Sequence, residues 1–160
     1  MKYLYLVGGV MLLGLTQCGQ VEADNCDQQL REIGELEGQL FVESQEVQSD
    51  VRSKLMQSYA AFANGCHDHD ETPEMLFRRA DLLRSAGKFE EAMTQLRDIH
   101  DHYKTFDKRA VCAFLVGFIA EVELNDREQA KKTYQQVVEL HPDSDAAEWA
   151  RQSLKALDVN

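Results

Sequence analysis

The chain has few of the residues and motifs that mark catalysis, flexible linkers or nucleic-acid binding. It contains only two prolines and one tryptophan among 160 residues and has no glycine- or serine-rich linker, so the body is not expected to be disordered. It has no G-x-S-x-G elbow, phosphate-binding glycine loop or H-E-x-x-H sequence. Basic residues are scarce, since 17 Lys and Arg face 28 Asp and Glu and give a net charge of −11. We therefore expect no enzyme, no cofactor and no nucleic-acid partner, and a monomeric body whose partner segment is basic.

The longest apolar run is at the N-terminus and indicates a targeting signal. Lys2 precedes an uncharged apolar stretch at 3–15, which is shorter than the roughly 20 residues of a membrane-spanning helix and fits a secretory signal. The run ends in Leu-Thr-Gln-Cys at 15–18, which resembles a bacterial lipoprotein cleavage box, with Gln17 at a place where that box prefers Gly, Ala or Ser. We predict a signal peptide over 1–17 and lipidation of Cys18, with plain secretion and an uncleaved anchor as alternatives.

The residues after the cysteine bear on the destination of the protein. In many Gram-negative bacteria Asp after the lipidated cysteine retains a lipoprotein in the inner membrane, and Gly19 stands there instead. The resemblance therefore implies an outer-membrane lipoprotein of a bacterial cell envelope that faces the periplasm. A secreted periplasmic protein and a surface-exposed lipoprotein are alternatives, the latter because the acidic stretch 20–24 is similar to a surface-export signal. Residues 18–27 are expected to form a polar tether.

Apolar residues then recur at spacings of three and four, which is typical of helices that bury one face. Thr72 is expected to cap a helix that starts at Pro73. Gly34 and Gly38 are expected to pack tightly against a neighbouring helix. The pattern predicts an all-α fold of about seven helices, over 28–42, 45–64, 74–85, 89–103, 108–124, 127–140 and from 143 or 144 to about 157.

Two segments share one skeleton of apolar stripe, turn and small residue. The first consists of Leu76, Ala80, Leu83, Gly87, Phe89, Ala92, Leu96 and Ile99, and the second of Phe114, Gly117, Asn125, Asp126, Ala130, Tyr134 and Val137. The second has one extra residue before its turn. Together with the segments 87–92, 125–134 and 141–144, this skeleton resembles the tetratricopeptide repeat. The resemblance implies repeats with a C-terminal capping helix over 72–160 and a degenerate helical hairpin over 28–71.

The stretches 114–119 and 123–126 are similar to small envelope lipoproteins that carry such repeats. More distant likenesses are the outer-membrane lipoprotein of the β-barrel assembly machine and the periplasmic coordinator associated with the Tol-Pal system. These resemblances imply a membrane-anchored scaffold that binds a protein or peptide in envelope biogenesis or organisation. In such arrays the first helix of each pair lines a groove for the partner. The groove residues expected from helix register are Arg78, Arg79, Asp81, Leu82, Phe118 and Glu121.

Two histidine-rich clusters suggest other functions. His67 and His69 alternate with acidic residues, as do His100 and His102, and imidazoles with carboxylates suit zinc. A solvated loop and a helix C-terminus explain them more simply, so we predict no metal site, and a metal-binding or chaperone-like protein is one alternative. A self-assembling structural lipoprotein, using the exposed face of the first helix, is another.

The cysteines and the tryptophan leave further questions open. Cys26 and Cys66 are candidates for a disulfide in an oxidising compartment, but sequence does not show whether they are within reach of each other. Cys112 lies in an apolar helix and is expected in the core. Trp149 is expected to cover the end of the array, with partner contact as the alternative.

Overall fold

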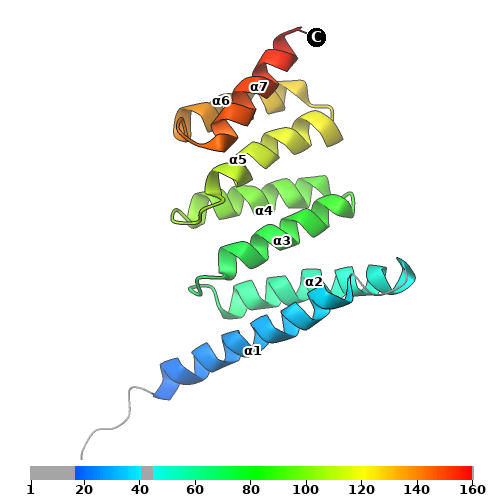
Figure 1. The fold of residues 1–160 in the computed structure, drawn as a ribbon, viewed down its shortest axis with the longest axis vertical. Coiled ribbons are helices and arrows are strands. Elements are labelled where there is room, and N and C mark those ends of the chain that lie inside the picture. Colours follow the sequence, from blue (N-terminus) through cyan, green and yellow to red (C-terminus); the bar gives the residue numbers. More distant parts are fainter. Residues whose placement is uncertain (1–16, 41–44, 160) are drawn as a thin grey trace, which may run out of the picture.

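The structure, a computed structural model, describes residues 17–40 and 45–159 and is helical throughout its regular elements (Figure 1). It confirms the all-α repeat array. The elements are α1 (Gln17–Gln39), α2 (Gln45–Gly65), α3 (Thr72–Ser85), α4 (Phe89–His102), α5 (Arg109–Phe118), the π-helical turn η1 (Ile119–Glu123), α6 (Arg127–Leu140) and α7 (Asp145–Val159).

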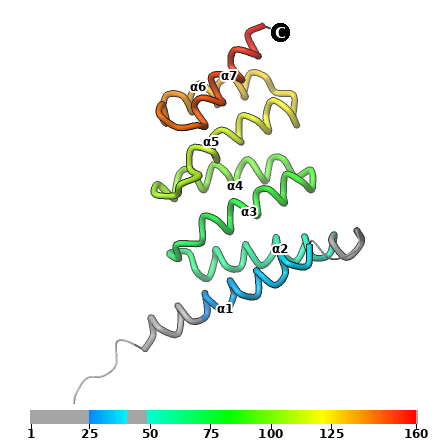
Figure 2. The backbone as a smooth tube through the Cα atoms, in the orientation of Figure 1, coloured from blue at the N-terminus to red at the C-terminus, as the bar shows by residue number. Residues whose placement is uncertain are grey.

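The helices form a ladder in which each packs against the helix before it and the helix after it. Figure 2 shows the chain reversing direction at every connection, so that α1 and α7 lie at opposite ends of the array. Short connections between antiparallel neighbours explain this stacking. α5 also packs on α7, the second helix after it along the chain.

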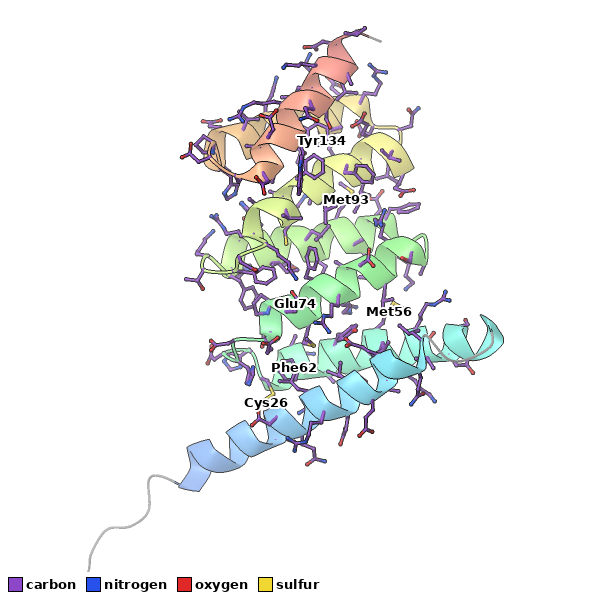
Figure 3. All side chains as sticks on the ribbon, viewed as in Figure 1. Cys26, Met56, Phe62, Glu74, Met93 and Tyr134 are labelled. Carbon is purple, nitrogen blue, oxygen red and sulfur yellow. A yellow bond between two sulfur atoms is a disulfide. The ribbon has the colours of Figure 1, made fainter. Side chains whose placement is uncertain are left out.

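The interior divides into two clusters of buried side chains. Of the residues labelled in Figure 3, Phe62 belongs to the first cluster and Tyr134 to the second. The N-terminal core lies between α1, α2 and the start of α3 and includes Ile33, Leu55 and Phe62. The larger repeat core joins α3 to α7. Its fully buried members include Leu83, Met93, Leu96, Ile99, Ile119, Tyr134 and Val137.

The turns inside the two pairs are equivalent in backbone shape. Gly87 has φ of 73° and Asn125 has φ of 52°, and these two residue types adopt the left-handed conformation at the lowest cost. The second pair has one more residue before its turn, and η1 accommodates it through a Leu124 N–H that donates to the carbonyl of Ile119. The predicted fifth helix therefore exists, but its last turn is π-helical.

The N-terminal boundary of the first helix differs from the prediction. α1 begins at Gln17 rather than Gln28, so the residues 18–27 expected as a polar tether are helical. Cys26 is buried in the N-terminal core, and this packing holds the segment in the helix. The expected end of this helix at 41–42 and most of the signal peptide, at 1–16, lie outside the described residues.

Two local expectations are wrong. Glu71, not Thr72, occupies the N-cap position of α3, and the hydroxyl of Thr72 donates to the carbonyl of Cys66 at 2.5 Å. Gly34 and Gly38 have no neighbour within 4 Å of an added Cβ, so neither supports a close helix contact. The cap at Asp126 is confirmed, because its carboxylate accepts from the N–H of Gln129 at 2.9 Å.

Within the described parts of the chain, none of the helices combines the length and the apolar character needed to cross a bilayer.

Candidate partner-binding face

The first helices of the successive pairs make direct contacts with one another. Arg78 of α3 pairs with Glu37 of α1, and Lys108, which precedes α5, pairs with Glu74 of α3. We call the surface formed by α1, α3, α5, η1 and α7 the A face. α2, α4 and α6 form the opposite side, the B face.

A row of charges crosses the N-terminal half of the A face. The Glu37 carboxylate accepts from the Tyr59 hydroxyl at 2.6 Å and from Arg78 Nη1 at 2.7 Å. Glu74 accepts from Arg78 Nε at 3.1 Å and from Lys108 Nζ at 2.6 Å. Partial burial opposes ionisation of Glu74, but the hydrogen bonds from Lys108 and Arg78 outweigh it and lower the pKa of this carboxyl. These charges are already paired and fix the spacing of α1, α3 and α5.

A shallow hollow lies between α3 and α5, next to this row. Its floor is apolar and its rim carries Asp81 and Arg84; the other lining residues are Phe77, Ala80, Leu96, Leu115 and Ile119. Arg84 contacts Asp81 at 3.4 Å and Glu123 of η1 at 3.5 Å. Both are long, exposed contacts, which contribute little to stability. The rim is therefore able to exchange these pairs for groups of a ligand.

An aromatic cluster continues the A face from α5 to α7. The ring of Phe114 lies 6.3 Å from Phe118, 5.4 Å from Tyr134 and 5.5 Å from Trp149, measured between ring centroids. Trp149 is 42% exposed. Its ring packs on Phe114 of α5, and the exposed part of the indole is open to a partner.

The expected groove residues separate into different environments. Arg78, Asp81 and Phe118 lie on the A face, in the charge row, the hollow rim and the aromatic cluster. Glu121 accepts the hydroxyl of Tyr134 at 2.7 Å. After burial, this hydrogen bond is the next cause of the raised pKa of Tyr134.

The other two expected residues serve packing instead. Arg79 donates to the carbonyl of Met56 and to Gln95 at 2.7 Å, between α2 and α4. Leu82 packs on the N-terminal core. Both residues lie on the side of α3 that faces α2. The groove prediction considered only the helices of the two repeats and so did not allow for contacts with α2.

Three A-face residues were missed by the sequence reasoning: Phe77, Arg84 and Leu115. Phe77, Asp81 and Arg84 follow one another at spacings of four and three, which places them on one helix face. That periodicity was sufficient to find them. Trp149 was named as a possible partner contact, and its place beside Phe114 follows from the packing of α7 on α5.

The histidines do not form one site. His67, His69 and His102 line a polar hollow of about 830 Å³ between the loops at 66–71 and 102–108, whereas His100 lies beside His141. Nowhere in residues 17–40 and 45–159 do three or more His, Cys, Asp or Glu side chains gather in a way that could hold a metal ion. The structure thus gives the metal-binding alternative no support.

The cysteines have separate roles. Cys26 of α1 and Cys66, which follows α2, are joined by a disulfide with Cα atoms 6.0 Å apart. Cys112 is a free, buried thiol, and burial raises its pKa to about 12. A thiol with so high a pKa is unreactive near neutral pH.

Comparison with known families places these features in a class. Residues 74–105 and 111–144 match the model of the tetratricopeptide repeat family, and these ranges correspond to the pairs α3–α4 and α5–α6 with η1. These two segments of the chain are therefore similar to tetratricopeptide repeats. Repeats of this kind are protein-interaction modules, typically without catalytic activity. No curated protein matches the sequence.

Proposed function

We propose that the protein is a membrane-anchored scaffold of a bacterial cell envelope that holds a segment of a partner protein on its A face. The observation that carries this proposal is that α5 contributes both to the apolar hollow beside α3 and to the aromatic cluster that includes the partly exposed Trp149. The residues that contribute most to binding at protein interfaces are often aromatic, and tryptophan is prominent among them.

The chemistry of the A face indicates the kind of segment it would hold. Apolar side chains of the partner would contact Phe118, Trp149 and the floor of the hollow. Basic side chains would approach Asp81 and Glu123, displacing Arg84 from its long contacts. The net charge of −11 would speed the encounter with a basic segment. Capture of this kind is passive and involves no reaction.

The proposed anchor is a lipid on Cys18, facing the periplasm from the outer membrane. Its support is the N-terminal sequence pattern and Gly19 after the cysteine. Acyl chains contribute about 0.8 kcal/mol per buried CH₂, so several of them would anchor the protein stably. The Cys26–Cys66 disulfide suits an oxidising compartment such as the periplasm.

The position of this disulfide would also keep the body near the membrane. Cys18 and Cys26 both lie in α1, and a helix rises 1.5 Å per residue, so roughly 12 Å would separate them along the axis. A lipidated Cys18 would thus hold the repeats close to the bilayer, where envelope-assembly partners act. Envelope biogenesis or organisation is the process we propose for them.

Anchoring and capture are tested together by comparing the full chain with a Cys18→Ser variant in cells. We expect the native chain in the membrane fraction, labelled by a radioactive fatty acid, and cross-linked to one reproducible set of envelope proteins. The variant should lose the label and the membrane association, and its cross-links to that set should weaken. An unlabelled native chain would contradict the anchor, and a native chain with no cross-linked protein would contradict the scaffold.

A further inference from the structure

Two histidines from different repeats face each other at the edge of the array. His100 lies near the end of α4, in the first repeat, and His141 follows α6, in the second. Their Nε2 atoms are 3.0 Å apart, a hydrogen-bond distance. The ring centroids are 5.2 Å apart with planes at 86°. The side chain of His100 is only 13% exposed and His141 is half-buried, so the contact is partly shielded from bulk water.

The groups around the pair carry charge of both signs. Nδ1 of His100 lies 2.8 Å from the carboxylate of Asp101. Arg109, at the start of α5, donates from Nε to the carbonyl of His100 at 2.8 Å, and its charge also acts on His141. Arg97 lines the same hollow as His100 and Asp101. One carboxylate and two guanidinium groups therefore surround the imidazoles.

The number of protons on the pair decides whether the contact persists. Asp101 accepts the Nδ1 proton of His100, which leaves Nε2 of a neutral His100 as an acceptor for the Nε2 proton of His141. One proton added at Nε2 of His100 keeps the bond in the reverse direction when the proton of His141 moves from Nε2 to Nδ1. A second added proton leaves two N–H donors facing each other, and the bond is lost. The charge of Arg109 disfavours the second proton, on His141.

We propose that His100 and His141 form a proton-sensitive brace between the two repeats, intact at neutral pH and released in acid. The brace joins the B-face helix of the first repeat to the end of the second. Its release would loosen the packing of α6 on α5 and change how α5 presents the A face. This inference does not depend on the anchor or on the identity of a partner.

The direction of the pH effect follows from His141. Burial, then the charge of Arg109, then His100 lower the pKa of this imidazole. The unfolded chain, with the ordinary value of about 6.5, consequently binds the proton more readily than the folded chain. The stability from the brace is complete above that value and is lost as the pH falls through the lower folded value.

The test uses the full chain and a His141→Gln variant, whose side-chain amide donates to His100 without titrating. Amide hydrogen exchange is measured at pH 7 and pH 5, after correction for the intrinsic effect of pH. The last turn of α6 is the reporter, because the His141 N–H donates there to the carbonyl of Val137. His67→Gln is the matched control, because the side chain of His67 is exposed and its ion pair is with the neighbouring Asp68.

We expect native protection of this turn to fall at least tenfold between pH 7 and pH 5 and to stay constant in His141→Gln. The His67→Gln protein should behave like the native chain. An equal fall in the native and His141→Gln proteins would overturn the proposal, as would a constant native value. If His141→Gln does not fold, the titration of His141 is followed in the native chain through its proton resonances. A midpoint at or above pH 6.5 would overturn the proposal, and a midpoint below pH 6.5 would support it.

Discussion

Gly117 of α5 lies directly against the ring of Tyr134 on α6. A Cβ added at Gly117 would be 2.7 Å from Cε1 and 2.8 Å from Cδ1 of that ring. Tyr134 is completely buried and its hydroxyl is held by Glu121, so the ring has little room to move. This contact is the physical reason for the small residue in the first helix of the second repeat.

Gly117→Ala should therefore destabilise the protein. Overpacking of a filled core costs about 1–3 kcal/mol, which exceeds or cancels the roughly 1 kcal/mol that alanine gains in helix propensity. We expect a net loss in the free energy of unfolding of about 1 kcal/mol, measured by urea titration. A variant more stable than the native chain would show that Tyr134 yields easily.

Gly34→Ala is the matched comparison and should have the opposite sign. Gly34 lies in the middle of α1, is exposed, and has nothing within 4 Å of an added Cβ. Only the propensity gain then remains, and we expect stabilisation of about 0.5–1 kcal/mol. A loss of stability in the same urea titration would contradict the open environment of Gly34.

Removal of the disulfide should loosen the N-terminal core. A Cys26→Ser, Cys66→Ser protein should lose about 2–4 kcal/mol, because the bridge restricts the unfolded chain over a separation of 40 residues. Dithiothreitol should have the same effect on the native chain and none on the variant. Equal stability of the native chain with and without the reductant would contradict the assignment.

Thr72→Val tests the buried hydroxyl beside this disulfide. Thr72 is the buried polar residue of the core, and its hydroxyl donates to the Cys66 carbonyl, which also accepts from the N–H of His69. Since that carbonyl keeps one partner, we expect a loss of about 1 kcal/mol. Thr94→Val, which removes an exposed bond to the carbonyl of Glu90, should change stability by less than about 0.5 kcal/mol. Equal effects at both positions would refute the role of burial.

The sequence was sufficient for most of the helices because they bury one face each. α6 begins at Arg127 and ends at Leu140, as expected from the Asp126 cap and the proline at 142. The fold class followed from the same periodicity. The π-helical turn was signalled only as one extra residue before Asn125, since spacing shows an insertion but not where the backbone absorbs it.

The candidate site was harder to predict, because the exposure of a side chain on a helix depends on which other helices pack beside it, and periodicity does not show this. Arg79 and Arg78 are adjacent in sequence, yet Arg79 bonds to α2 and α4 whereas Arg78 bonds to α1. The N-terminal boundary was missed for a similar reason. The polar residues before Gln28 give no apolar stripe, and their place in α1 depends on the long-range contact of Cys26.

The central claim, capture of a partner on the A face, is tested most directly by site-specific photo-cross-linking in cells. A photoreactive phenylalanine analogue is placed at Trp149 on the A face or at Leu140 on α6, which are both exposed apolar positions at 42% and 60%. We predict a discrete cross-linked product from position 149 and none from position 140. A product from position 140 alone would contradict the account and move the binding surface to the other side of the array.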